Sequence, residues 1–531
     1  MFACLGYLLL TLAASAVNVP FAWTSSAGPL ARLPRAEVNT VEDAFQWVDH
    51  AFQRVAAAGV FGTTPTALEG RSVGISTCFS GIGSPEIACR AIQNGHREFL
   101  LKRGEDGAKG ITFLCRWAIE KSIKAQAELL HLRPPPTHVF RNIFDLLPCQ
   151  RHREVGLGRG ASEPNPDTLK AWLPKVQILR RAQCIACGHP CTLQATDVHV
   201  AGSPCTGHSS YGERGALSSV QAKLFYLWLA LVQAFQFAVA IHENVPQFGE
   251  EDLLAFLSGT WLVLRLLICP SALGWPIARS RQYCLALRKD VVQMLIPVPR
   301  TVASLCPRML VQQLEEFRHA VFDRTCNVTF HVFFVAGDSE VEQEKQWARS
   351  RPGTLGRYAG ADAHNDMPGS CLTCLTAAER ERWATASNID PLALWDLGQD
   401  PLARPNRSRQ GILPCLVSGA GIQYCGEKGR WLLMREHFVS MGFPVYASQQ
   451  QAMGGSTCQF SDGQQAPKSR TRASGMHQAG NTMHVNASGV ALLMSLWCLP
   501  HLGASELPGT SQRRAGEPDS GFARAFKRMT Q

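Results

Sequence analysis

Strand-like and helix-like segments alternate along the chain from Arg71 onward, and this alternation restricts the fold more than any other feature of the sequence. The first unit is a β-type run, SVGISTCF (72–79), followed by the glycine-rich turn SGIGSPE and the helically spaced IACRAIQ. Further runs of strand character occur within ITFLCRWAIE, HVFRNIFDLL, VHVAGSPC and FAVAIHENV. Strands that alternate with helices predict an α/β fold with a Rossmann-like, doubly wound parallel sheet. Functional sites in such sheets lie at the carboxyl ends of the strands.

The same pattern divides the chain into regions. We expect residues 71–300 to form the main α/β domain, and residues 1–70 to be a leader or targeting segment and a linker. The alternation is lost over 301–425, which we predict to be a separate small domain with a strand at NVTFHVFFV (327–335). Order returns over 426–500, which we expect to complete the main domain with a helix at NASGVALLMSLWCL (486–499). The polar tail, 501–531, has a composition typical of disorder.

Composition limits the class of protein but not its activity. The chain has 531 residues, 46% of them hydrophobic, which is enough for two or three domains with a large core. Its net charge of +10 is compatible with a polyanionic partner, although the basic residues are scattered and many basic proteins bind no nucleic acid. The 19 cysteines are too irregularly spaced for a disulfide framework, so we expect a reducing compartment.

Two apolar segments bear on localisation. MFACLGYLLLTLAASA resembles a signal peptide without a preceding basic residue, and the stretch that follows has no acidic residue before Glu37, as in organellar transit peptides. A disordered tail is the alternative interpretation. The second segment, LFYLWLALVQAFQFAVAI (224–241), contains two glutamines and leads into HENV, so we predict a buried helix followed by a buried strand. No stable membrane association is expected.

Five residues carry the chemistry that the pattern places at strand ends. Gly81 and Gly83 follow the first strand, where they allow a ligand to approach the backbone, although a plain tight turn has the same sequence. Glu120 ends the second strand and is suited to a ribose, or is simply exposed. Cys205 follows Pro204 in a glycine- and serine-rich segment, a setting that suits a nucleophilic thiol more than a core cysteine. Glu243 ends another strand and supplies an acid.

Taken in order, these motifs resemble those of the cytosine-5 DNA methyltransferase family. FSGIGS (79–84) is similar to the cofactor loop of the family, WAIE to its ribose-binding segment, GSPCTGHSSYGERG to its nucleophile motif and HENV to its acidic motif. GWPIARSR (274–281) is similar to the segment with two arginines, RWLLMREHFVSMGFP to a structural motif and QAGNTMHVN to the closing motif. The set runs in family order over roughly 72–500, with the target-recognition domain expected in the insertion before RWLLMRE.

The resemblance implies a reaction and a role for each catalytic residue. Cys205 would add as a thiolate to carbon 6 of a flipped cytosine, which activates carbon 5 toward the methyl group of S-adenosylmethionine. Glu243 would bond N3 and the exocyclic amine, and Arg281 would hold the carbonyl oxygen. Pro204 and Asn244 would shape the pocket, and Arg279 is the other arginine of the pair. The loop 206–215 would close over the base.

The resemblance also implies a cofactor site. Phe79 would stack on the adenine, Glu120 would take the ribose hydroxyls, and Asn481 and Val485 would close the site. The remaining residues expected there are Ser80, Gly81, Gly83, Asn142 and Ile143. Asn142 stands where the family usually has an adenine-binding aspartate, and its amide oxygen can accept the same hydrogen bond.

Departures from the family pattern keep other functions open. Thr77, Thr206, Ile277 and Leu433 stand where the family usually has an acid, two glutamines and a threonine. A transfer-RNA methyltransferase of the same fold is one alternative, although its Cys-Phe-Thr signature is missing from this sequence. A catalytically silent DNA-binding homologue is another. The family implies a nuclear protein, whereas the N-terminus suggests a plastid or another organelle. Oligomeric state is left open.

A cysteine-rich segment, CIACGHPC (184–191), is a candidate metal site. Its possible ligands are Cys184, Cys187, His189 and Cys191. The CxxCxHxC spacing is tighter than in the usual zinc fingers, so a reduced loop without metal is the favoured interpretation. CLTC (371–374) is a weaker candidate of the same kind.

Overall fold

The computed structural model describes residues 34–57, 68–105, 107–152, 155–156, 165–172, 176–205, 222–249, 251–291, 307–352, 354, 371–403, 405–417, 421–461 and 471–497. Residues 1–33 of the predicted leader, the whole of the predicted loop 206–215 and the predicted tail 501–531 lie outside these residues.

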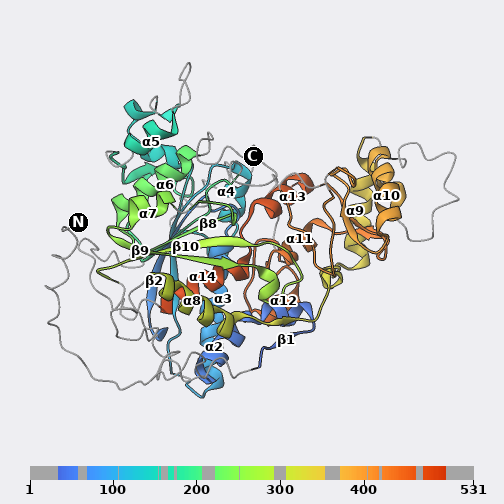
Figure 1. The fold of residues 1–531 in the computed structure, drawn as a ribbon, viewed down its shortest axis with the longest axis horizontal. Helices are drawn as coiled ribbons and strands as arrows, with labels where there is room; N and C mark the ends of the chain where they lie inside the picture. The colour runs from blue at the N-terminus through green and yellow to red at the C-terminus, as the bar shows by residue number, and fades with distance from the viewer. Residues whose placement is uncertain are drawn as a thin grey trace.

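A seven-stranded sheet forms the centre of the main domain (Figure 1). In spatial order its strands are β4 (His138–Phe140), β3 (Thr112–Ile119), β2 (Ser72–Cys78), β7 (Val198–Ala201), β8 (Val239–Asn244), β10 (Arg281–Arg288) and β9 (Trp261–Ile268). All neighbours are parallel except β10, which is antiparallel to both β8 and β9. Every residue of β7 and β8 is buried, as expected for parallel strands covered on both faces. The predicted doubly wound α/β fold is confirmed.

Helices cover both faces of this sheet (Figure 1). One face carries α2 (Trp47–Ala57), α3 (Ser84–Lys102), α8 (Pro307–Phe322) and α14 (Val485–Trp497). The other carries α5 (Pro166–Trp172), α6 (Ala222–Phe235) and α7 (Glu251–Leu257), whereas α4 (Ile123–Leu130) lies on the side of α3, with the Leu129 side chain 3.2 Å from a Cβ position on Gly83. Every residue of α14 is buried, and Gly489 permits the indole of Trp47 to lie directly against the helix backbone. The C-terminal segment therefore completes the core of the main domain, as predicted.

The apolar run at 224–241 forms the predicted helix and strand. α6 is buried along almost its whole length, and β8 follows after a short turn. His242, Glu243 and Asn244 are the last three residues of β8. No helix among the described residues is both long and apolar enough to cross a membrane.

Residues 37–57 belong to the main domain, which corrects the prediction that 1–70 is only a leader and linker. β1 (Glu37–Val38) pairs in parallel with β11 (Thr325–Cys326), and α1 (Val41–Phe45) and α2 follow it. Phe52 is fully buried and stacks on His96 with 5.0 Å between ring centroids. Arg324 donates to the carbonyls of Asp43 and Ala44 at 2.6 and 2.8 Å. The segment is held because its apolar face fills the space between α3, α8 and α14.

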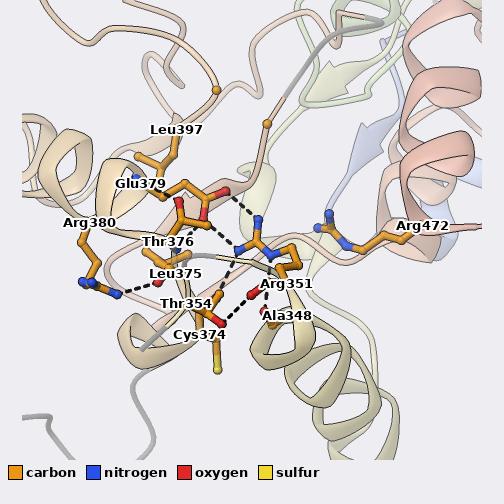
Figure 2. Close-up of polar contacts among 12 residues, drawn as sticks. Ala348, Arg351, Thr354, Cys374, Leu375, Thr376, Glu379, Arg380, Leu397 and Arg472 are labelled. Carbon is orange, nitrogen blue, oxygen red and sulfur yellow. Dashed lines mark hydrogen bonds and ion pairs between the residues drawn. The ribbon is translucent and has the colours of Figure 1, made fainter. Parts of the chain in front are cut away.

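A second apolar cluster marks the smaller domain, which contains residues from Ala336 to Leu433. Its elements are α9 (Asp338–Ser350), η12 (Leu372–Cys374), α10 (Ala377–Ile389), β12 (Leu394–Asp396), β13 (Gln423–Cys425) and β14 (Arg430–Trp431). Figure 2 shows the polar contacts that join the end of α9 to α10. The two terminal guanidinium nitrogens of Arg351 each donate to one carboxylate oxygen of Glu379 at 2.8 Å. Glu379 also accepts the backbone N–H of Thr376 and so caps α10.

The smaller domain begins later in the chain than predicted, and one predicted strand is absent from the described residues. α8 packs against α2 and β9, so residues up to 322 belong to the main domain rather than to a region that begins at 301. Residues 327–335 do not form the predicted strand, and Phe330–Phe333 instead form the 3₁₀ turn η10. Phe330 and Phe333 are both buried, and a spacing of three residues places them on one side of a 3₁₀ turn but on opposite faces of a strand.

Candidate active site

Cys205 lies just beyond β7, on a segment that the neighbouring strand β8 holds in place. The hydroxyl of Ser203 is 2.8 Å from Nε2 of His242, and the amide of Asn244 donates to the carbonyl and hydroxyl oxygens of Ser203, each at 3.2 Å. Ser203, His242 and Asn244 are all buried. Pro204, which is half-buried, restricts the backbone immediately before the thiol. The Asn244 amide therefore fixes the position of Ser203, two residues before Cys205.

Glu243 and Arg281 meet at the ends of two adjacent strands. β8 and β10 are antiparallel, with Glu243 opposite Tyr283, so the end of β8 lies beside the beginning of β10. Nε of Arg281 is 3.2 Å from a carboxylate oxygen of Glu243, and only 15% and 12% of these side chains are exposed. A Cβ atom on Gly202 would lie 3.1 Å from the other carboxylate oxygen, which places the segment before Cys205 against Glu243. The structure thus brings together the three residues predicted for catalysis.

Burial and charge set the protonation of this group. Burial raises the pKa of the Cys205 thiol, and the carboxylate of Glu243 raises it further, while Arg281 and Arg279 act in the opposite direction. Burial also raises the pKa of Glu243, and the same two arginines oppose that increase. The thiol therefore depends on the guanidinium groups for any increase in its thiolate fraction, and the carboxyl retains its proton to a higher pH than an exposed glutamate.

Arg279 has a positioning role in the structure, which differs from the catalytic role implied by its place in the arginine pair. Its guanidinium is buried and donates to the carbonyls of Leu416, Gly480 and Thr482 at 3.1, 3.1 and 2.7 Å. These acceptors come from the segment before β13 and from the end of α13 (Arg472–Asn481). Arg279 therefore connects the segment before β13 to the end of α13, next to the residues predicted for catalysis.

Cys415 is a second thiol beside the arginine pair, and sequence reasoning missed it. Its sulfur lies 3.6 Å from a nitrogen of Arg279 and 3.7 Å from a nitrogen of Arg281. Burial raises the pKa of this thiol, but the two guanidinium groups outweigh burial and lower the pKa below its usual value. Only the three-dimensional fold brings Cys415 within reach of residues more than 130 positions earlier, so no local pattern could have identified it.

The comparisons with known proteins agree with this arrangement. Residues 185–316, which include Cys205, Glu243 and Arg281, match the sequence model of the C-5 cytosine-specific DNA methylases. This segment is therefore similar to the corresponding part of the C-5 cytosine-specific DNA methylases. No curated protein matches the sequence.

Solved structures align with most of the chain at low identity. A candidate DNA modification methyltransferase from an E. coli prophage is 14% identical, with 80% of this chain and 99% of that chain aligned and a TM-score of 0.40. The S. pombe Dnmt2 methyltransferase is 12% identical, with 80% and 98% of the chains aligned and a TM-score of 0.38. A Spodoptera frugiperda DNMT2 mutant is 14% identical, with 80% and 99% aligned and a TM-score of 0.34.

The predicted cofactor loop lies at the carboxyl ends of β2 and β3. One carboxylate oxygen of Glu120 accepts the backbone N–H of Gly81 at 2.7 Å, and the other accepts that of Ser122 at 2.7 Å. Phe79 and Gly83 have φ values of 55° and 90°, a region that glycine favours and that costs a non-glycine residue conformational energy. The space over Gly81 is open except for the Thr482 hydroxyl at 4.0 Å from a Cβ position. The loop is thus a glycine cradle beside a carboxylate.

The acid that the family usually has at Thr77 is replaced here by a hydrogen-bonded pair. The Thr77 hydroxyl is 2.6 Å from both the hydroxyl of Ser80 and a carboxylate oxygen of Glu86. Glu86 is buried, and burial raises its pKa although Thr77 acts in the opposite direction. The hydrogen bonds of Thr77 to Ser80 and Glu86 therefore link the end of β2 to the predicted cofactor loop and to the first turn of α3. Glu86 was not identified from the sequence.

The remaining predicted cofactor residues are placed unequally. The Asn142 side chain accepts the N–H of Phe144 at 3.2 Å and caps η3 (Ile143–Leu146), while Ile143 itself is buried. Asn481 is exposed and bonds His477 at 2.9 Å. Val485 is fully buried and its N–H donates to Met441, so it belongs to the core and not, as predicted, to the cofactor site. Thr482, which bonds Ser84 at 2.6 Å, is the residue of the closing motif that reaches the loop.

The predicted metal ligands also require a correction. The three cysteines of 184–191 converge, but the histidine that joins them is His138 from β4 rather than His189. His189 is exposed, and its Nδ1 lies 3.3 Å from the carbonyl of Pro190 and 3.5 Å from the sulfur of Cys191, but it is not part of the group whose ligand atoms all lie within 4.8 Å of one another. The local spacing within 184–191 pointed to His189 and could not show that His138, about 50 residues earlier in the chain, completes the group.

Proposed function

We propose that this protein transfers a methyl group from S-adenosylmethionine to carbon 5 of cytosine in DNA, through a covalent adduct with Cys205. The observation that carries the proposal is the convergence of Cys205, Glu243 and Arg281 at one strand edge within the segment that matches the methylase family. The glycine cradle beside Glu120 lies along the same edge, two strands away, which suits a reaction between a cofactor and a base.

The three residues act on different atoms of the ring. Cys205 adds as a thiolate to carbon 6, and Glu243, which retains a proton readily, bonds N3 so that the ring accepts the electron pair. Arg281 bonds the carbonyl oxygen and also lowers the pKa of the thiol. Carbon 5 then takes the methyl group, a base removes the proton from carbon 5, and the thiolate leaves as the double bond re-forms.

The residues at the other end of the edge fit the cofactor. S-adenosylmethionine supplies an electrophilic methyl group when it is bound. The open space over Gly81 leaves room for the methionine portion, and Glu120 is placed to accept ribose hydroxyls at the end of β3. Gly83 instead allows Leu129 and Leu132 to pack against the start of α3, at 3.2 and 2.7 Å from its Cβ position. Phe79 is half-buried beside this loop and offers an aromatic face for the adenine.

DNA is the proposed substrate, and RNA is the alternative. The segment match is to a DNA methylase family, and the Cys-Phe-Thr signature of the transfer-RNA branch is absent from the sequence. A cytosine within a duplex is inaccessible to Cys205, so the base must leave the stack. The net charge of +10 is consistent with either nucleic acid.

A methyl-transfer assay with radiolabelled cofactor tests the proposal directly. The full chain is offered duplex DNA, transfer RNA or neither, beside Cys205→Ala and the matched control Cys149→Ala, whose thiol is exposed and remote from the site. We expect label at carbon 5 of DNA cytosine for wild type and Cys149→Ala, and none for Cys205→Ala. Label on transfer RNA alone would assign the RNA activity. Cofactor binding by a folded protein with no transfer to either would indicate the silent homologue.

A further inference from the structure

Four side chains with metal-binding atoms converge beside the edge strand β4, away from the catalytic residues. His138, Cys184, Cys187 and Cys191 each offer one ligand atom, and these atoms all lie within 4.8 Å of one another. Nδ1 of His138 is 3.4 Å from the sulfur of Cys187 and 3.7 Å from that of Cys184. In a tetrahedral zinc site with ordinary bond lengths, a sulfur and a nitrogen ligand are about 3.6 Å apart. The group therefore has the size of a tetrahedral metal site.

The backbone around the cysteines has the form of a metal-binding turn. β5 (Arg181–Gln183) and β6 (Pro190–Thr192) make a short antiparallel hairpin, with Cys184 after the first strand and Cys191 in the second. The N–H of Gly188 donates to the carbonyl of Cys184 at 3.0 Å, which closes a tight turn that contains Cys187. Gly188 has a φ of 74°, a conformation that glycine adopts without strain. The turn directs all three sulfurs to one side.

Neither a disulfide nor simple core packing explains the cluster. The three thiols are unpaired by disulfide bonds, and a group of three leaves one without a partner in any pairing. Cys184 is buried but Cys187 and His138 are only half-buried, so the group is not an ordinary apolar core. A histidine nitrogen among three sulfurs is the ligand set that zinc prefers.

We propose that His138, Cys184, Cys187 and Cys191 bind one structural zinc ion. Four protein ligands leave no open position, so the ion does not take part in methyl transfer. It fastens the β5–β6 hairpin to the outer edge of β4, where Ile185 donates to the carbonyl of Val139 at 2.7 Å and Cys184 forms a bridge with Phe140. β4 ends two residues before Asn142, so the ion also supports the strand that leads into the predicted adenine site. The metal content does not depend on whether the protein transfers methyl groups.

The decisive experiment compares two histidines of the full chain, purified without a polyhistidine tag or chelator. We expect wild type and His189→Ala to contain one zinc ion per chain by elemental analysis, and His138→Ala to lose most of it. His138→Cys keeps four zinc ligands and should restore the metal. Equal zinc loss in the two alanine variants, or a folded wild-type protein with no zinc, would overturn the proposal.

A spectroscopic measurement keeps the proposal testable if His138→Ala does not fold. Wild-type protein expressed with Co²⁺ in place of zinc should show the visible absorption bands of a tetrahedral thiolate site. Those bands should be unchanged in His189→Ala and in Cys149→Ser, a control that removes one exposed thiol. Octahedral-type weak absorption, or bands that Cys149→Ser reduces as much as Cys187→Ser does, would contradict a site at these four residues.

Discussion

At the scale of single residues, the catalytic group combines opposing charges within a buried space. Glu243 lies between the nucleophile segment and Arg281, so it raises the pKa of the thiol that it must assist. The two arginines counter this effect, with Arg281 in direct contact with Glu243 and Arg279 fixed by three backbone carbonyls. Removal of either charge should therefore change thiol reactivity in a direction that the structure specifies.

The first prediction concerns the reactivity of Cys205 without substrates. Because Glu243 raises the pKa of the thiol and Arg281 lowers it, Glu243→Gln should speed alkylation of Cys205 at pH 8, and Arg281→Gln should slow it. Each rate should rise with pH, because alkylation requires the thiolate, and the rising limb should move to lower pH in Glu243→Gln and to higher pH in Arg281→Gln. Peptide mass spectrometry of iodoacetamide-treated protein separates Cys205 from the other cysteines. Changes of the same sign in both variants would contradict the assignment.

The second prediction concerns Gly202, where the chain approaches Glu243. A Cβ at this position would lie 2.6 Å from the Met483 methyl group and 3.1 Å from a Glu243 oxygen. Gly202→Ala should displace Glu243 and cost about 1–3 kcal/mol of transition-state stabilisation, or roughly 5- to 150-fold in kcat. Gly107→Ala is the matched control, because no atom lies within 4 Å of its Cβ position. Unchanged kcat in Gly202→Ala would show that Glu243 is not held against this segment.

At the scale of secondary structure elements, the sequence predicted what a continuous apolar run determines and missed what tertiary contacts determine. Helix α6 and strand β8 could be predicted because a nearly continuous apolar run spans most of α6 and the first half of β8. The turn at 330–333 could not be predicted, because its aromatic residues favour a strand locally. The turn depends on tertiary contacts such as the stacking of Trp275 on Phe333, with 6.1 Å between ring centroids. Likewise the strand-end residues Cys205 and Glu243 follow from local motifs, whereas Cys415 and His138 join their groups only through contacts distant in sequence.

The third prediction tests whether α2 belongs to the cooperative core of the main domain. Phe52 is fully buried against His96, Phe99 and Trp497, so Phe52→Ala should lower the free energy of unfolding by about 3–5 kcal/mol. Gln53→Ala, at the exposed neighbour, should change it by less than about 0.5 kcal/mol. Urea unfolding followed by tryptophan fluorescence measures both. Equal stabilities would place α2 outside the cooperative core.

At the scale of the whole molecule, segments far apart in the chain assemble one working edge. β2 and β3 supply the cofactor end, β7, β8 and β10 supply the catalytic end, and the loop after α13 returns to touch both through Thr482. Arg279 joins this loop to Leu416 of the segment before β13, so one buried guanidinium connects two parts of the chain that are far apart in sequence. The motifs in the sequence predicted which strand ends come together, because each motif stands at the end of a strand. They could not predict that Arg279 would bond carbonyl groups of Leu416, Gly480 and Thr482.

The fourth prediction concerns Arg279. Arg279→Lys cannot satisfy three carbonyls in the same planar geometry, so methyl transfer should fall at least tenfold while the Cys205 thiol keeps its reactivity within a factor of about three. Single-turnover methyl transfer and Cys205 alkylation, measured on the same preparation, separate the two effects. A parallel loss of thiol reactivity would instead assign Arg279 to activation of the nucleophile.

Trapping the covalent adduct tests the central claim most directly. In duplex DNA whose target cytosines carry fluorine at carbon 5, no proton can leave after methyl transfer, so the bond between carbon 6 and the sulfur should persist. We predict a denaturation-stable complex that requires S-adenosylmethionine, maps by mass spectrometry to the peptide containing Cys205 and is absent from Cys205→Ala. Methylation of ordinary DNA by the same preparation without any adduct, or an adduct on another cysteine, would contradict the assignment of Cys205 as the nucleophile.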